Sequence, residues 1–362
     1  MNNNLLLEMG PYFTRKLLEW NAKDNRREMP WKGEKDPYKI WLSEIILQQT
    51  RVEQGWSYYL KFIEHFPSVV DLAKAPEEKV FKLWEGLGYY SRCRNLIASA
   101  RIIHNEHNNI FPRTYEDVLA LKGVGGYTAA AIVSFAYNQP YAVVDGNVLR
   151  VLARYFGIRT AIDSTEGKKL FASLAQELLP QQQAGIYNQA LMDFGATVCK
   201  PQSPTCASCP VSKKCIAYEK NQVDLLPVKE KKLKRTQRWF YYVVLRYKDE
   251  TFITQRTKKD IWQSLYEFPM IEIPELELNE KELTTHPAFA TYLKNGDITG
   301  ISKPYVQHLT HQTIHGRFIE IQLRKRPAFP DAFISLSLKN LKAFAFPKLI
   351  NNYLMEKNVN LS

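Results

Sequence analysis

Two carboxylates occupy sequence surroundings that predict opposite protonation states. Glu44 lies in YKIWLSEIILQQT, a run that is apolar nearly all round, so burial is expected to raise its pKa and leave it a proton near neutral pH. Asp145 precedes GNVLRVLARYF, a predicted helix whose N-terminus should keep the carboxylate ionised. A proton donor and a fixed anion suit hydrolysis of a glycosidic bond. The alternative for Asp145 is a plain N-cap.

A compact group of cysteines is the most specific pattern in the sequence. The group is formed by Cys199, Cys206, Cys209 and Cys215. Structural zinc usually takes two close pairs separated by a longer loop, whereas this spacing favours one 4Fe–4S cluster, with zinc as the alternative. Four protein ligands would leave no open coordination position, so we predict a structural role. Cys93 stands apart and is interpreted as an ordinary thiol.

A glycine-rich turn precedes another apolar helix. Gly123, Gly125 and Gly126 lie in LKGVGGYTAAAIVSFAY, just before the first free N–H groups of that helix. Glycines permit close approach of a backbone, and a helix N-terminus favours an anion. The turn is therefore a candidate phosphate site, with an ordinary loop as the alternative.

Composition limits the partners that such residues could serve. The 362 residues carry a formal charge of +12, which predicts a polyanionic partner, either a nucleic acid or an anionic membrane surface. The apolar runs are shorter than the roughly 20 residues that a membrane-spanning helix needs, and the start MNNNLLLEMG lacks a signal-peptide pattern. We predict a cytoplasmic protein that does not bind a membrane.

The periodicity of the sequence predicts two domains that would position these residues. Apolar residues at helical spacing predict an all-α domain over residues 1–225. A basic stretch, KEKKLKRTQR, lies within a predicted linker at 226–238. The β-branched and aromatic runs WFYYVVLRY and TFITQR, followed later by a helical pattern from Phe346, predict an α+β domain over 239–362.

Three motifs together resemble a known group of enzymes. A helix–hairpin–helix near 121–136, the VDGNVLRV sequence and the cysteine loop at 199–215 resemble the endonuclease III superfamily of DNA glycosylases. SEIILQQTRV, GVGGYTA and NQALMDFG are similar to its adenine DNA glycosylase branch, the MutY family. The resemblance implies hydrolysis of adenine from double-stranded DNA at mispairs with 8-oxoguanine or guanine. It also implies a monomer located on the bacterial nucleoid.

The resemblance assigns chemistry to four residues. Glu44 would protonate N7 of adenine and then activate water, and Asp145 would stabilise the oxocarbenium ion. Tyr127 and Asn147 would orient the two carboxylates. Strand-cleaving relatives carry a lysine at the position of Tyr127, so we expect base removal without efficient lyase activity.

Further residues would extract and recognise the base. Gln49 and Tyr89 would enter the base stack left by the flipped adenine. The residues that would form the adenine pocket are Arg27, Met29, Trp31 and Gln189. The alternatives are a surface cation for Arg27, simple packing for Trp31 and a core aromatic for Tyr89.

The second domain resembles a Nudix fold that reads 8-oxoguanine in the family. QRTKKDIWQSLYEFP resembles the corresponding stretch of that fold. No acid-rich metal-binding helix follows it, so we predict no pyrophosphatase activity. Thr310 and His311 match the lesion-contacting loop, with Leu309 in place of its aromatic residue.

Two other functions compete with adenine removal. One is a glycosylase–lyase for oxidised pyrimidines, which Tyr127 and the long second domain disfavour. The other is a noncatalytic DNA-binding protein that senses redox state through its cluster. The pair of Glu44 and Asp145 argues against it, because binding alone requires neither carboxylate.

Overall fold

The computed structural model describes residues 3–230, 235–273, 278–327 and 332–357. The chain folds into two compact units, the first formed by residues 1–74 and 95–231 and the second by residues 75–94 and 232–362. Residues 75–94 group by their contacts with the carboxyl-terminal residues. The boundary between the units lies in the predicted basic linker, but strand β1 begins at Thr236, inside the predicted range 226–238.

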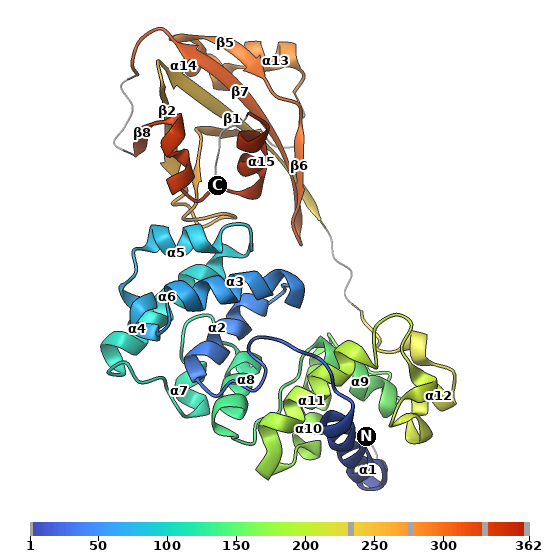
Figure 1. Ribbon diagram of the computed structural model, residues 1–362. Helices are drawn as coiled ribbons and strands as arrows, with labels where there is room; N and C mark the ends of the chain where they lie inside the picture. Colours follow the sequence, from blue (N-terminus) through green and yellow to red (C-terminus); the bar gives the residue numbers. More distant parts are fainter. Residues whose placement is uncertain (1–2, 231–234, 274–277, 328–331, 358–362) are drawn as a thin grey trace. The chain divides into compact units, whose positions relative to one another are not determined.

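The first unit is built from helices with short connections (Figure 1). Its α-helices are α1 (Asn3–Lys23), α2 (Pro37–Leu47), α3 (Val52–His65), α4 (Val69–Lys74), most of α6 (Tyr90–Glu106), α7 (Tyr115–Leu119), α8 (Gly126–Tyr137), α9 (Gly146–Tyr155), α10 (Thr165–Leu178), α11 (Ala184–Thr197) and α12 (Ile216–Glu219). Short 3₁₀ helices lie at Gln181–Gln183, Cys206–Ser208, Ser212–Lys214 and Val223–Leu225.

Local sequence explains where the site-bearing helices begin. Asp36 caps α2 by accepting a hydrogen bond from the Tyr38 backbone N–H at 2.9 Å, and Pro37 takes the first helical position, where its missing N–H costs nothing. Helix α8 starts directly after the glycine turn, where Gly123 adopts φ +78°. A Cβ atom at Gly123 would lie 2.7 Å from that of Asn95, so only glycine fits without a rearrangement.

A hydrophobic core holds α1, α9, α10 and α11 of the first unit together. Phe13, Leu152 and Phe171 are completely buried in it. Cys199, Cys209 and Cys215 pack against the same core, so the cysteine loop is anchored to helix α9 and its neighbours. Burial of this apolar surface is the main stabilising contribution, at about 25 cal/mol per Å².

The second unit contains a mixed sheet with helices, which agrees with the predicted strands and closing helix. The strands are β1 (Thr236–Tyr247), β2 (Glu250–Gln255), β3 (Tyr266–Glu267), β4 (Met270–Glu272), β5 (Gly296–Ile301), β6 (Tyr305–His308), β7 (Gln312–Leu323) and β8 (Phe333–Ser337). The helices are α5 (Glu77–Trp84), α13 (Glu280–Thr285), α14 (Ala290–Leu293) and α15 (Lys348–Glu356), with 3₁₀ turns at Pro287–Phe289 and Leu338–Ala343.

The sheet has one parallel pairing at its centre. Its strand order is β3-β2-β1-β7-β5, with β4 beside β1, β6 beside β7 and β8 beside β2. Strands β1 and β7 run parallel from Thr236 opposite Gln312 to Arg246 opposite Gln322, and the other pairs are antiparallel. The β6–β7 hairpin is tight, and its turn carries Thr310 and His311.

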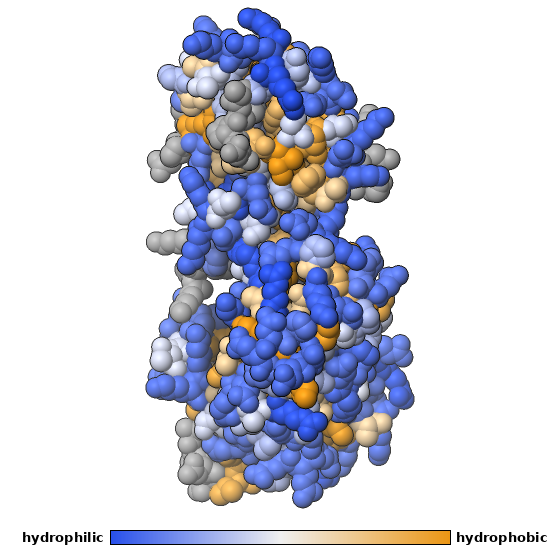
Figure 2. Space-filling view, turned by 90° about the vertical axis from the view of Figure 1, so that its left-hand side faces the viewer, coloured by the Kyte–Doolittle hydropathy of each residue, from blue (hydrophilic) through white to orange (hydrophobic). Residues whose placement is uncertain are grey.

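The visible face of each unit is predominantly hydrophilic (Figure 2). Hydrophobic residues appear there in small groups, and the large apolar side chains lie in the cores. Within the described residues, no helix combines the length and apolar character required to cross a bilayer.

Candidate active site

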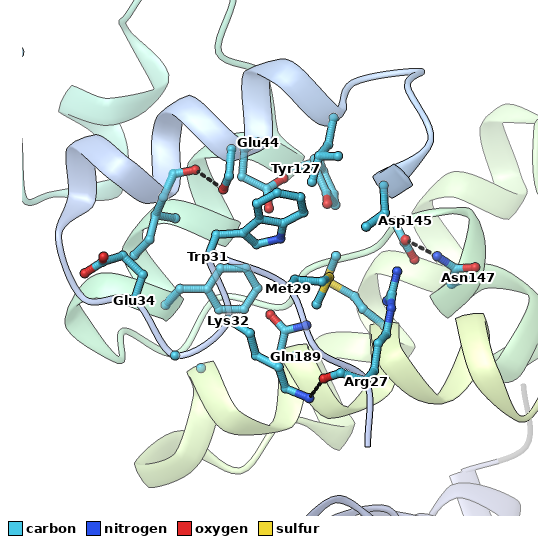
Figure 3. A pocket seen from close by; sticks show the side chains of 18 of the residues that line it. Arg27, Met29, Trp31, Lys32, Glu34, Glu44, Tyr127, Asp145, Asn147 and Gln189 are labelled. Atoms are coloured by element: carbon cyan, nitrogen blue, oxygen red, sulfur yellow. Dashed lines mark hydrogen bonds between the residues drawn. The ribbon is translucent and has the colours of Figure 1, made fainter. Parts of the chain in front are cut away.

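A cavity of about 670 Å³ opens in the first unit between α2, α8, α11 and the segment that joins α1 to α2 (Figure 3). The N-terminal end of α9 completes its wall. The predicted residues that line it are Arg27, Met29, Trp31, Glu44, Gln49, Tyr127, Asp145, Asn147 and Gln189. The helical fold thus brings the two carboxylates and the expected base-contacting residues to one pocket.

Glu44 is buried in the cavity wall, as the sequence predicted. It is only 6% exposed, and burial raises its pKa to about 7. A hydrogen bond from Tyr127 opposes this increase, and the nearby charge of Asp145 adds to it. Near neutral pH, Glu44 therefore exists as a mixture of acid and carboxylate, which is the condition required of a group that donates and then accepts a proton.

Asp145 is the N-cap of α9. Its carboxylate accepts hydrogen bonds from the Val148 backbone N–H and from the Asn147 side-chain amide, each at 2.7 Å. We expected the helix N-terminus to dominate, but burial outweighs these bonds and raises the pKa of Asp145 above its ordinary value. The capping contact and the amide of Asn147 hold the carboxylate in one orientation.

Tyr127 lies between the two carboxylates. Burial and the adjacent Glu44 and Asp145 raise its pKa well above the ordinary value for tyrosine. Its hydroxyl therefore remains neutral and donates a hydrogen bond to Glu44. Tyr127 lies in the first turn of α8, directly after the glycine turn.

Apolar and aromatic groups form another part of the wall. Met29 and Trp31 are almost completely buried. The Trp31 ring packs edge-on against Tyr59 at 5.2 Å between centroids, and Trp56 lies 6.2 Å away. Gln49, in contrast, is exposed just beyond α2 with φ 56°, so its side chain stands at the rim of the pocket.

A buried carboxylate that the sequence analysis missed organises the floor of this pocket. Asp193 on α11 is fully buried and forms ion pairs with Arg27 at 2.9 Å and Lys32 at 3.0 Å. Arg27 is therefore no free surface cation, which was the alternative interpretation. An aspartate inside NQALMDFG, next to residues expected in the core, is the signal that could have revealed it, because a buried charge must be paired.

Arg150 is a second residue that the sequence analysis missed. Its guanidinium donates hydrogen bonds to Oδ1 of Asn147 at 2.9 Å and to the carbonyl oxygens of Gly195 at 2.6 Å and Cys199 at 2.8 Å. It therefore connects the amide that holds Asp145 to the first residue of the cysteine loop.

The four cysteines border one small cavity beside α9. Val151, Phe194 and Val211 contribute its apolar surface, and an Arg154 N–H lies 3.6 Å from Sγ of Cys199. Within the described ranges, no set of three His, Cys, Asp or Glu side chains is arranged to hold one metal ion. Four thiolates are the donor set that an iron–sulfur cluster takes, so the chemistry of these residues fits such a group.

The remaining predicted residues do not line the pocket. Gly123, Gly125 and Gly126 form an exposed turn elsewhere in the first unit. Tyr89 belongs to the second unit, where it adopts φ 48°, is 40% exposed and shares a hydrogen bond with Thr310. Tyr89 is thus no core aromatic, and His311 beside Thr310 is also exposed.

Comparisons with known proteins match both parts of the chain. Residues 42–181 match the HhH-GPD superfamily base excision DNA repair proteins, and residues 240–356 match the NUDIX domain. A solved structure described as a thermostable thymine-DNA glycosylase is 34% identical, with a TM-score of 0.55 over 59% of this chain and 98% of its own. An endonuclease III–DNA complex, 23% identical with a TM-score of 0.51, shares the fold over 58% of this chain and 95% of its own.

Relatives of this chain share one name across bacteria and animals. The adenine DNA glycosylase of Buchnera aphidicola subsp. Baizongia pistaciae is 38% identical over 71% of this chain and 73% of its own length. That of Homo sapiens is 41% identical over 59% of this chain and 41% of its own length. With the two carboxylates in one pocket and this extent of similarity, the chain belongs to the adenine DNA glycosylase family.

Proposed function

We propose that this chain hydrolyses adenine from double-stranded DNA at mispairs with 8-oxoguanine or guanine, as a step of base excision repair. One observation carries the proposal: a buried glutamic acid with a pKa of about 7 shares a cavity with an oriented aspartate. In this proposal residues 1–225 form the catalytic domain, and residues 239–362 read the lesion after the linker at 226–238.

The chain's own residues supply each proton transfer. Glu44 gives its proton to N7 of adenine as the bond between N9 and the sugar breaks. Asp145 stabilises the oxocarbenium ion that remains, and Asn147 holds its carboxylate in place. Water then attacks the sugar and gives a proton back to Glu44. Tyr127 offers no amine for an imine with the sugar, so strand cleavage is not expected to follow.

Enclosure of the base would involve the other residues of the pocket. Met29 and Trp31 supply an apolar wall for a flipped purine, and Gln189 and Arg27 meet its polar edge. Gln49 at the rim and the exposed Tyr89 would enter the stack that the adenine leaves. Thr310 and His311 would contact the base opposite, and their exposure supports such a role.

Two further sites would support DNA binding. The turn of Gly123, Gly125 and Gly126 would receive a DNA phosphate on its backbone N–H groups. The four cysteines would hold one 4Fe–4S cluster, which fixes the loop through covalent iron–sulfur bonds. The shared space bordered by the thiols supports this assignment.

The test is single-turnover base release from matched duplexes that carry adenine opposite 8-oxoguanine, guanine or thymine. We expect adenine release that favours 8-oxoguanine, with strand scission only after alkali. Absence of adenine release, or scission without alkali on oxidised pyrimidines, would instead support a glycosylase–lyase. Iron and sulfide analysis of the purified protein tests the cluster separately.

A further inference from the structure

Asp193 forms the centre of a buried hydrogen-bond network under the pocket. Its Oδ1 accepts from Nη1 of Arg27 and Nε2 of Gln189, both at 2.9 Å. Its Oδ2 accepts from Nδ2 of Asn25 at 2.9 Å and pairs with Lys32 at 3.0 Å. Each oxygen thus has two donors, and the negative charge lies between two cations. A fully buried carboxylate is well satisfied by such a set.

This network fixes the orientation of the Gln189 amide. A carboxylate only accepts hydrogen bonds, so Gln189 must turn its NH₂ group toward Asp193. The carbonyl oxygen of the same amide is then available to the pocket that Gln189 lines (Figure 3). A rotation of the amide by half a turn would place its oxygen against the carboxylate oxygen of Asp193, two acceptors without a shared proton, which is costly.

We infer that Asp193 is a positioning residue that makes Gln189 a hydrogen-bond acceptor and thereby selects purines with an amino group at C6. The inference rests on the proposed function. Adenine carries its N6 amino group next to N7 on the same edge, so a base that offers N7 to Glu44 also presents a donor at C6. Guanine and hypoxanthine carry an oxygen there, which would face the Gln189 oxygen without a shared proton.

The same network holds two cations of the pocket wall against one carboxylate. Arg27 and Lys32 both pair with Asp193, and Nζ of Lys32 also donates to the Arg27 carbonyl oxygen at 2.7 Å. The carboxylate of Asp193 offsets one of these two positive charges. At the C6 position of the base, selection depends on the Gln189 oxygen. A site that hydrogen-bonds one polar group rejects analogues that lack it far more strongly than an apolar site does.

The first experiment compares excision of adenine and hypoxanthine, each opposite 8-oxoguanine, by the wild-type chain and by Gln189→Leu. We expect the adenine-to-hypoxanthine rate ratio to fall at least about tenfold in the variant, which corresponds to loss of one hydrogen bond that discriminates the two bases. An unchanged ratio would overturn the inference. If the wild-type chain released no adenine, the proposed function itself would fail, so the two failures are distinguishable.

The second experiment uses Asp193→Asn, because an asparagine can offer either its oxygen or its NH₂ to Gln189. The amide of Gln189 is then free to turn, and we expect the same ratio to fall about tenfold through a gain in hypoxanthine release. Asp249→Asn, an exposed site between β1 and β2, changes the net charge equally and should preserve the ratio. A folded Asp193→Asn variant with wild-type selectivity would contradict the inference. If this variant does not fold, an unchanged ratio in Gln189→Leu would still overturn it.

Discussion

The pocket of the first unit and the turn of the second unit contain predicted base-contacting residues under very different conditions. At the pocket, Glu44 in the wall and Asp193 beneath it are buried. Burial raises the pKa of Glu44, and four donors hold the carboxylate of Asp193. At the β6–β7 turn, Thr310 is partly exposed, and its hydroxyl contacts that of the exposed Tyr89.

This difference in burial indicates that the pocket residues carry out the chemistry and the turn residues contribute to recognition. A low dielectric can move a pKa by several units and strengthen each electrostatic contact, so buried residues can lower a reaction barrier. Exposed hydroxyl and imidazole groups exchange water for ligand with little net gain, typically about 1 kcal/mol per hydrogen bond. Substitutions in the pocket should therefore have much larger effects than substitutions in the turn.

The largest effect is expected for Glu44→Gln. Glutamine has nearly the same shape but cannot protonate the leaving base, so single-turnover release of adenine should fall by about 10²- to 10⁴-fold. Binding of the mismatched duplex should be retained, which is measured by fluorescence anisotropy. Unchanged excision by this variant would remove Glu44 from the mechanism.

Arg150→Lys should have the next largest effect. The guanidinium holds Asn147, Gly195 and Cys199 at the same time, and a single ammonium group cannot reach three acceptors in this geometry. Loss of orientation at Asp145 should slow excision by about 10- to 100-fold. The exposed Arg159→Lys is the control, and equal rates for the two variants would show that the connection to the cysteine loop is dispensable.

These two predictions also show what the sequence could and could not provide. Glu44 and Asp145 were found because helix periodicity and capping are local properties, visible within a dozen residues. Asp193 and Arg27 lie 166 positions apart, so their ion pair is a product of the tertiary fold. The carbonyl partners of Arg150 carry no sequence signal at all, since every residue has a carbonyl.

The same distinction between local and long-range properties applies to the fold of the second unit. Strands β1 and β2 were predicted from their aromatic and β-branched composition. The parallel pairing of β1 with β7 was not, because it joins segments separated by more than seventy residues and depends on packing of the whole sheet. The grouping of residues 75–94 with the second unit is likewise a long-range property.

The pH dependence of excision should show a smaller but specific effect. The active form needs Glu44 protonated, so above a pKa of about 7 the single-turnover rate should fall about tenfold for each unit of pH. On the acid side the rate should fall when Asp145, whose pKa burial raises, becomes protonated. Rates measured at saturating enzyme across pH 5 to 9 test this. A flat alkaline limb would contradict the assignment of Glu44 as the acid.

The smallest effect is expected for Thr310→Val in the turn. Valine keeps the shape of threonine but removes the hydroxyl that Tyr89 meets, so Tyr89 loses one restraint on its exposed side chain. The preference for 8-oxoguanine over guanine opposite adenine should fall about threefold, within the range for one solvent-exposed hydrogen bond. Thr310→Ser retains the hydroxyl and should keep the preference. A loss as large as that of Glu44→Gln would mean that the turn takes part in catalysis, and the distinction between the two regions would no longer hold.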